Sequence, residues 1–224
     1  MKKLMAGCFL CSTLMLTSCA PLCPDAQISS ARVRIVHASP DAPAVDVCVN
    51  GAPAFEGVAF AGVTDYAPLV PGTYSVSVTA AGAGCSSAAV IDADLSVSAG
   101  QDLSVVALNV LSEIEPLVLV DDNSSPPAGK ARVRFVHASP NAPTVDITLP
   151  DSTALFDNIV FKQSSSYLEV TAGSYTLQVR DETGTVVVLT LNDVQLAAGK
   201  IYSVFAVGLL NGTPALDALI TVDN

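Results

Sequence analysis

Two histidines, each followed nine residues later by an aspartate, are the residues whose types and spacing best suit chemistry. The pairs are His37 with Asp46 and His137 with Asp146, and the 224-residue chain contains no other histidine. An aspartate that hydrogen-bonds an imidazole can orient it as a general base, and the two side chains together can ligate a metal ion. The pairs therefore define an enzymatic hypothesis, either a hydrolase or a metal-dependent enzyme.

A structural role for the histidines competes with that hypothesis, and the sequence favours it. His37 alternates with Val33 and Ile35, so its ring shares one strand face with apolar side chains. We therefore expect a buried histidine that hydrogen-bonds either the loop after the strand or the aspartate. Ser39 and Ser139 are poor nucleophile candidates, because each precedes a proline and lies outside a Gly-x-Ser-x-Gly turn. Neither a catalytic residue nor a metal site is predicted.

The histidines lie in a stretch of 17 residues that occurs twice, at 31–47 and 131–147, with 13 identical positions. Self-similarity at an offset of 100 residues indicates two copies of one domain rather than a short-period solenoid. The motif residues to which we assign a structural role are Arg32, His37, Ser39, Pro40, Pro43, Asp46, Arg132, His137, Ser139, Pro140, Pro143 and Asp146.

Short alternating apolar runs, separated by Pro, Gly, Asn and Asp, predict strands and turns throughout both copies. In the first copy, residues 32–38 form one strand, two prolines end it, and residues 44–49 form the next. A Gly-x-Tyr sequence at Tyr74, and again at Tyr175, resembles the corner tyrosine of immunoglobulin-like domains. About seven or eight such strands in each copy predict an all-β protein of two tandem antiparallel β-sandwiches.

The motif Arg-x-x-His-Ala-Ser-Pro-x-Ala-Pro-x-Val-Asp is followed by Gly-x-Tyr and by Ala-Gly before the penultimate strand. This pattern resembles the bacterial extracellular repeat family known as domain of unknown function 4397, and the resemblance covers nearly all of residues 31–224. It implies an exported, often tandem sandwich of the immunoglobulin-like or transthyretin-like kind. It implies no activity.

The N-terminus has the pattern of an export signal: two lysines, a short apolar core, and then Leu16-Thr17-Ser18-Cys19. The last four residues resemble the bacterial lipobox, in which the cysteine receives the lipid and becomes the mature N-terminus. A second tetrad ends at Cys8 but leaves almost no apolar core before it. Ala20, where an aspartate would retain the protein at the inner membrane, resembles lipoproteins of the Gram-negative outer membrane. We therefore predict an exported protein that Cys19 anchors in a membrane of the cell envelope.

These assignments divide the chain into a signal peptide, a lipid tether, a first sandwich, a linker and a second sandwich. Their boundaries, in chain order, are 1–18, 19–30, 31–121, 122–130 and 131–224. The linker is polar and stiffened by prolines, and it gives little reason to expect strong coupling between the domains. Asp121-Asp122-Asn123 at its start indicates a hinge rather than a cation site.

Two cysteines, Cys48 and Cys85, have no counterpart in the second repeat, so we predict that they form a disulfide with each other. In an oxidising compartment such a bridge adds about 3 to 4 kcal/mol of stability by the chain-entropy argument. Cys23 is then left over in the tether, unpaired or linking two molecules.

The formal net charge of −11 argues against a nucleic-acid partner, because little in the chain could neutralise a row of phosphates. The acidity is concentrated in the first repeat, where residues 31–123 hold 11 acidic residues against Arg32 and Arg34 alone. Residues 130–224 hold nine acidic residues against six basic ones. No phosphate loop, nucleotide fingerprint or calcium loop is present in the sequence, so no cofactor is predicted.

The arginines of the motif occur in pairs, Arg32 with Arg34 and Arg132 with Arg134. We expect them to pair with Asp46 or with other nearby acidic residues rather than to bind an anion.

The favoured interpretation is a cell-envelope lipoprotein whose sandwiches act as a non-enzymatic binding or structural module for a glycan, a peptide or another envelope protein. The alternative is an enzyme that uses the two His/Asp pairs. The two hypotheses differ in whether these pairs lie in an open cleft or beneath a packed sheet.

Overall fold

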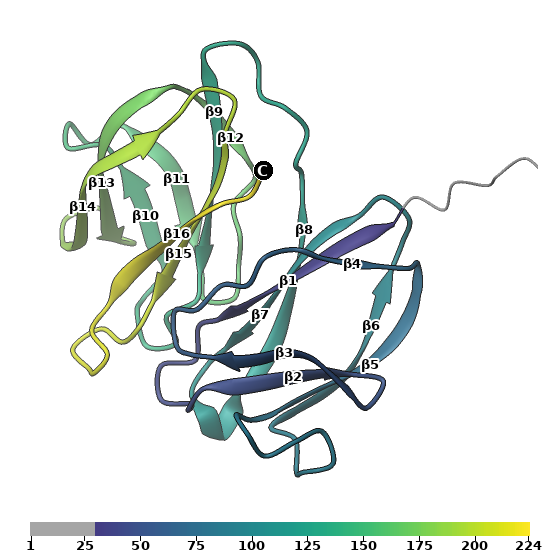
Figure 1. Cartoon of the computed structure of the whole chain (residues 1–224). Coiled ribbons are helices and arrows are strands. Elements are labelled where there is room, and N and C mark those ends of the chain that lie inside the picture. Colours follow the sequence, from purple (N-terminus) through teal and green to yellow (C-terminus); the bar gives the residue numbers. More distant parts are fainter. Residues whose placement is uncertain (1–29) are drawn as a thin grey trace, which may run out of the picture.

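The computed structural model describes residues 30–224, and this part of the chain is built almost wholly from β-strands (Figure 1). The strands form two successive sets, which we call domain 1 and domain 2. Domain 1 comprises β1 (Ala31–His37), β2 (Val45–Val49), β3 (Ala52–Val58), β4 (Ala67–Leu69), β5 (Gly72–Ala80), β6 (Ile91–Val97), β7 (Asp102–Leu108), the short 3-10 helix η1 (Leu111–Glu113) and β8 (Glu115–Asp121). Domain 2 comprises β9 (Lys130–His137), β10 (Val145–Thr148), β11 (Ala154–Ile159), β12 (Leu168–Thr171), β13 (Gly173–Asp181), β14 (Val187–Leu196), β15 (Ile201–Val207) and β16 (Asp217–Val222). The predicted all-β fold class is confirmed.

Each domain contains two four-stranded sheets with the same strand order. The sheets of domain 1 run β4-β1-β7-β8 and β3-β2-β5-β6, and those of domain 2 run β12-β9-β15-β16 and β11-β10-β13-β14. Neighbouring strands are antiparallel except for one pair in each domain, β1 with β7 and β9 with β15, which are parallel. Between the two strands of each parallel pair the chain passes to the second sheet and back twice, with β4 or β12 as the strand between the two crossings.

Alternation along the strands places one side of each sheet in the interior of its domain. In domain 1 the interior contains Val33 and Ile35 of β1, which pack in one cluster with Val45 and Val47 of β2. Val133, Phe135, Val145 and Ile147 make the equivalent cluster in domain 2. Each domain of residues 30–224 therefore has a hydrophobic core of its own, built from both of its sheets.

The two Gly-x-Tyr sequences form corner tyrosines, as the sequence predicts. The hydroxyl of Tyr74 donates to the carbonyl of Val70, and that of Tyr175 donates to the carbonyl of Thr171, both at 2.6 Å. Each bond ties the start of a long strand to the chain four residues upstream, and so fixes where β5 and β13 enter their sheets.

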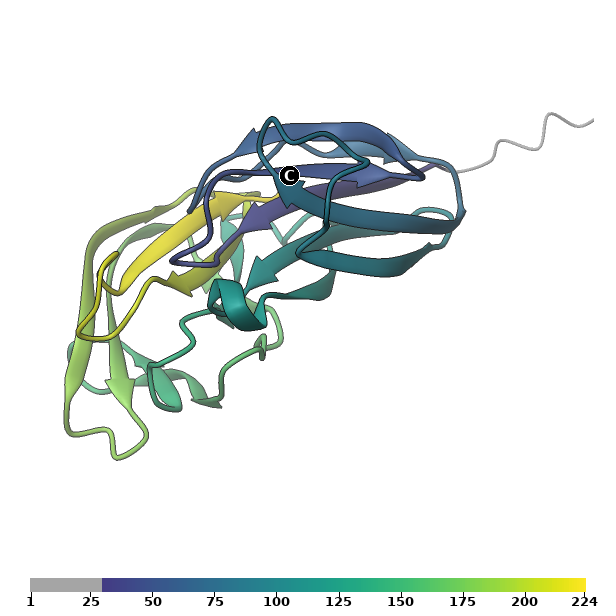
Figure 2. The same cartoon turned by 90° about the horizontal axis from the view of Figure 1, so that it is seen from below.

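A third hydrophobic cluster lies between the domains, which sit side by side in both views (Figures 1 and 2). The residues of this cluster come from the strand faces that point away from the sandwich interiors. Its buried members are Val36, Ala38, Val106, Leu108, Leu119, Val136, Ala138, Phe205 and Val207. The expectation of weakly coupled domains is therefore wrong, because both copies of the alternating motif bury their second face against each other.

Among the residues that the structure describes, no helix has the length and apolar character needed to cross a bilayer.

Candidate functional site

His37 and His137 are completely buried at the ends of β1 and β9, where each holds the proline-containing loop that follows its strand. The Nε2–H of His37 donates to the carbonyl of Pro43 at 3.0 Å, and that of His137 donates to the carbonyl of Pro143 at 2.9 Å. The Nδ1 of His37 also accepts a hydrogen bond from the backbone N–H of Ser39 at 3.3 Å. The sequence left two hydrogen-bond partners open for each histidine, the loop after its strand or the aspartate. Both histidines bond the loop.

Burial lowers the pKa of both imidazoles below the ordinary value, although the bonds to the proline carbonyls act in the opposite direction. The neutral ring also fits the contacts of His37, because a proton on Nδ1 would face the N–H of Ser39. The edges of the rings pack against Phe60 and Phe161, with centroids 6.5 and 6.1 Å apart. Both histidines are therefore held neutral inside the fold.

The aspartates of the motif bind backbone amides rather than the histidines. Asp46 accepts from the N–H of Gly57 at 2.7 Å with one oxygen and from the N–H of Gly82 at 2.8 Å with the other. Asp146 accepts from the N–H of Asn158 at 2.7 Å. The His/Asp pairs of the enzymatic hypothesis are not hydrogen-bonded, because these carboxylates bind amides near the ends of β3 and β11 and, for Asp46, of the turn after β5 instead.

The serines of the motif are also buried. Ser39 and Ser139 have no exposed surface, and the Oγ of Ser139 donates to the carbonyl of Gly208 at 2.7 Å. Within residues 30–224, no three His, Cys, Asp or Glu side chains gather closely enough to hold a metal ion. The motif thus forms a buried connection between strand and loop, in which most polar groups are hydrogen-bonded; the Oγ of Ser39 and the Nδ1 of His137 are buried there without a partner in the described part of the chain.

The first arginine of each motif pairs with acidic residues near it, exposed in the case of Arg32 and largely covered in the case of Arg132. Arg32 bonds Asp102 on the neighbouring strand β7 through both carboxylate oxygens, and this contact holds the pKa of Asp102 below its usual range. Arg132 bonds Asp122 of the linker at 2.9 Å and Glu169 at 3.3 Å. Neither arginine pairs with Asp46 or Asp146, so the more specific part of that expectation is wrong.

The second arginine of each motif crosses to the other domain. Arg34 of β1 bonds Asp223, which follows β16, at 2.6 Å, and Arg134 of β9 bonds Asp121 at the end of β8. All four side chains are almost fully buried. Arg34 also lies 4.0 Å from Asp121 of its own domain. The arginines therefore do pair with acidic residues, but the shortest contact of each crosses to the other domain, because β1 and β9 turn this face toward it.

Hydroxyl groups complete the cluster around these ion pairs. Ser104 and Ser203, on β7 and β15, each accept from the Nε–H of an arginine at 2.7 Å and donate to Asp121 or Asp223. The hydroxyl of Tyr66 also donates to Asp121 at 2.5 Å. Burial and this bond raise the pKa of Tyr66. Asp121, predicted to belong to a hinge, is instead a buried acceptor that locks the two domains together.

Cys48 of β2 and Cys85 in the loop after β5 form a disulfide, with Cα atoms 5.8 Å apart. The pairing predicted from their joint absence in the second repeat is present in the structure. The bridge fastens the loop between β5 and β6 to the sheet of domain 1.

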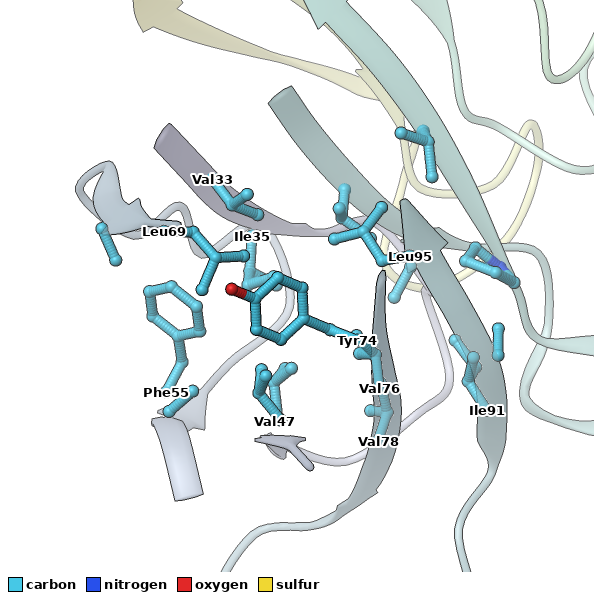
Figure 3. A pocket seen from close by; sticks show the side chains of 18 of the residues that line it. Val33, Ile35, Val47, Phe55, Leu69, Tyr74, Val76, Val78, Ile91 and Leu95 are labelled. Carbon is cyan, nitrogen blue, oxygen red and sulfur yellow. The ribbon is translucent and has the colours of Figure 1, made fainter. Parts of the chain in front are cut away.

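A cavity of about 190 Å³ lies between the two sheets of domain 1, and nearly all of its lining is apolar (Figure 3). Phe55 and Leu69 lie at one side of the cavity, Leu95 and Ile91 at the other, and Tyr74 between them. The corresponding cavity of domain 2 has a volume of only about 20 Å³. No single motif marks this feature in the sequence, because its lining comes from all eight strands of domain 1. A size comparison of the repeats, position by position, could have found it.

The predicted lipid attachment at Cys19, the signal peptide 1–18 and almost all of the tether, including Cys23, lie outside the described residues. They remain predictions from the sequence.

The comparisons with known proteins find one family. The model of the family described as "Domain of unknown function (DUF4397)" matches residues 31–148 and again 148–224. No curated protein matches the chain significantly. Among solved structures, the chain is similar to the C-terminal domain of AlgF from P. aeruginosa, with 17% identity and a TM-score of 0.32. That match covers 43% of this chain and 99% of the other, and at such a score it carries no argument about fold or function.

Proposed function

The chain belongs to the DUF4397 family, whose domain is described as one of unknown function, and from this premise we propose that it is an exported, lipid-anchored protein of the cell envelope that acts as a non-enzymatic binding or structural module. Its partner would be a glycan, a peptide or another envelope component. The Gram-negative outer membrane is the location that Ala20 favours.

Export is supported by two independent features. The N-terminal pattern that ends at Cys19 is the first, and the disulfide between Cys48 and Cys85 is the second, since disulfides persist in oxidising compartments outside the cytoplasm. Substitution of Cys19 by alanine should abolish incorporation of a labelled fatty acid and leave the unprocessed precursor. Continued labelling of the Cys19→Ala chain would contradict the anchor.

The observation that carries the non-enzymatic proposal is how the motif uses its reactive groups. His37, Ser39 and their counterparts have no exposed surface, and Asp46 gives both carboxylate oxygens to backbone amides. These residues recur in both domains because they hold the loop that follows β1 or β9. This structural role accounts for the repeated motif, and no catalytic role is needed to explain it. A module of this kind acts through surfaces or cavities that its rigid sheets hold in place.

The test is retention of an envelope component without its chemical conversion. Residues 30–224 are immobilised and exposed to envelope extract, and the retained material is compared by mass spectrometry with the same material before exposure. We expect a retained component of unchanged mass, and the same result with a His37→Gln chain. Conversion of a component to products, lost in the His37→Gln chain, would establish the enzyme instead. Retention of nothing above an unrelated control domain would reject the binding role.

A further inference from the structure

We propose that the cavity of domain 1 binds one alkyl chain of an amphipathic molecule whose head group is neutral or cationic. The inference rests on the proposed function of a binding module and names its ligand class. Four features of the described residues carry it: the volume, the difference in side-chain size between the domains, the shape of the lining and the charge around it.

The volume is large enough for a hydrocarbon group. An apolar protein cavity of about 150 Å³ stays free of water and binds benzene, and the cavity of domain 1 measures about 190 Å³. Its lining contains one charged residue, Asp94, among more than a dozen aliphatic and aromatic side chains. A polar ligand would lose its hydration there without gaining partners, so the ligand class is apolar.

The cavity exists because domain 1 carries smaller side chains at positions that domain 2 fills. Strand registers and the internal repeat align the two linings residue by residue. Eight positions that are apolar in both domains are smaller in domain 1: Ile35 for Phe135, Val47 for Ile147, Val49 for Leu149, Ala54 for Leu155, Ala67 for Leu168, Val76 for Leu177, Ala93 for Leu191 and Val118 for Ile220. Three positions change in the other direction, Leu69 for Val170, Leu95 for Val194 and Pro116 for Ala218. The net change removes side-chain volume from both sheets of one domain.

The lining extends across the sandwich and reaches the surface at both edges. Ala54 of β3 and Pro68 of β4 are exposed lining residues at one edge, and Pro116 and Val118 of β8 are exposed lining residues at the other. Between these edges Val47, Tyr74 and Val76 lie along the middle of the space (Figure 3). An elongated group that enters from an edge fits this shape better than a compact ring.

The charge of domain 1 decides the head group. Asp94 of β6, an edge strand, is exposed and belongs to the lining, so a head group left beside this strand meets a carboxylate. Residues 31–123 hold 11 acidic residues, and of their two arginines Arg34 is buried against the partner domain. An anionic head group is therefore disfavoured, and a neutral or cationic one is accepted.

The experiment titrates residues 30–224 with octylamine, 1-octanol, octanoate and benzene, each below the concentration at which it self-associates, and follows backbone amides by NMR. We expect saturable shifts of domain 1 amides on β2, β5 and β6, with octylamine and octanol binding more tightly than octanoate by at least about threefold at low salt. The preference of both over octanoate should shrink at high salt, because salt screens the repulsion of octanoate as well as the attraction of octylamine. Benzene should bind more weakly than octanol.

Matched variants assign the binding to the cavity. Ala93→Leu and, separately, Ala67→Leu give domain 1 the residue of domain 2 and should each weaken octanol binding at least about tenfold while the melting temperature is kept or raised. Ala154→Leu, the same change at an exposed position of domain 2, should leave binding unchanged. If one filling variant fails to fold, the other still tests the site.

Two outcomes would overturn the inference. One is that none of the four probes shifts domain 1 amides saturably, and the other is that binding persists at full strength in both filling variants. Either result leaves the proposed function standing if the envelope component is still retained by residues 30–224. Conversely, alkyl binding without retention of any envelope component would remove the proposed function while the cavity site remains.

Discussion

The two domains share a motif, a strand order and a set of buried polar contacts, but they stabilise their cores differently. Domain 2 packs its core with larger side chains and leaves a cavity of about 20 Å³, whereas domain 1 keeps one of about 190 Å³. At about 24 cal/mol for each Å³, the larger cavity costs domain 1 about 4 to 5 kcal/mol. The disulfide between Cys48 and Cys85 occurs in domain 1 alone, and by the chain-entropy argument it contributes about 4 kcal/mol. The comparison teaches that a covalent bond can replace packing where a domain keeps its interior open.

The largest expected effect concerns the buried ion pairs to which both domains contribute one arginine and one aspartate. Arg34→Ala leaves Asp223 buried without its cation, and Arg134→Ala leaves Asp121 with only Arg34 at 4.0 Å, so each should lower the free energy of unfolding by about 3 to 5 kcal/mol. We also expect the single calorimetric transition of the parent protein to split into two. Equal losses in the two variants would show that the interface is shared evenly, and a loss below about 1 kcal/mol in either would contradict the buried ion pairs.

Removal of the disulfide tests whether this bond offsets the larger cavity of domain 1. Cys48→Ala with Cys85→Ala should lower the free energy of unfolding by about 3 to 4 kcal/mol in chemical denaturation, because the reduced chain gains the entropy of an open loop. The matched control is the parent protein with reductant, which should lose the same amount. If the open cavity is what the disulfide offsets, adding Ala93→Leu should restore about 1 kcal/mol.

Phe55 and Phe156 occupy equivalent positions in the two cores. Phe55 lies opposite Val47 on β2, and Phe156 lies opposite the matching Ile147 on β10. Phe156→Ala should cost about 3 kcal/mol, near the lower end for a buried phenylalanine, because its ring is partly exposed. Phe55→Ala should cost less, because the ring already borders open space and makes fewer contacts. Equal costs, measured by urea denaturation, would mean that domain 1 is packed as tightly as domain 2.

The histidines should make the free energy of unfolding depend on pH, and the contribution of each domain should be about the same. Burial lowers the pKa of His37 and His137 in the folded protein, whereas in the unfolded chain each has the ordinary pKa of about 6.5. The unfolded state then binds more protons in the window below that value, so the free energy of unfolding should fall as the pH is lowered from about 7 to about 5. The slope should decrease by half in either His→Gln variant and vanish in the double variant. A slope that survives the double variant would assign it to other groups.

The sequence predicted the strands, the corner tyrosines and the disulfide because these depend on local patterns or on comparison of the repeats. Residues 31–37 alternate clearly, and Gly-x-Tyr marks a turn before a strand wherever it lies. The interface was missed because Arg34 and Val36 alternate with buried residues in the way that a solvent-facing strand side does. Asp121 was assigned to a hinge because its neighbours are polar, although its partner Arg134 is 13 residues away in the next domain. The cavity was missed because its lining residues are spread over eight strands and leave no contiguous signal.

The crossed ion pairs between the domains carry a consequence for how such chains assemble. Arg34 contacts Asp223 and Arg134 contacts Asp121, so each domain presents the same donor and acceptor and receives the same pair in return. This reciprocity defines an isologous interface, the kind made by a two-fold symmetric homodimer. The tandem chain is in these terms a covalently linked dimer, in which fusion fixes the two copies at a high effective concentration and allows their interiors to diverge. A chain with a single repeat that kept the arginine, the aspartate and the apolar face would complete the same cluster with a second copy of itself.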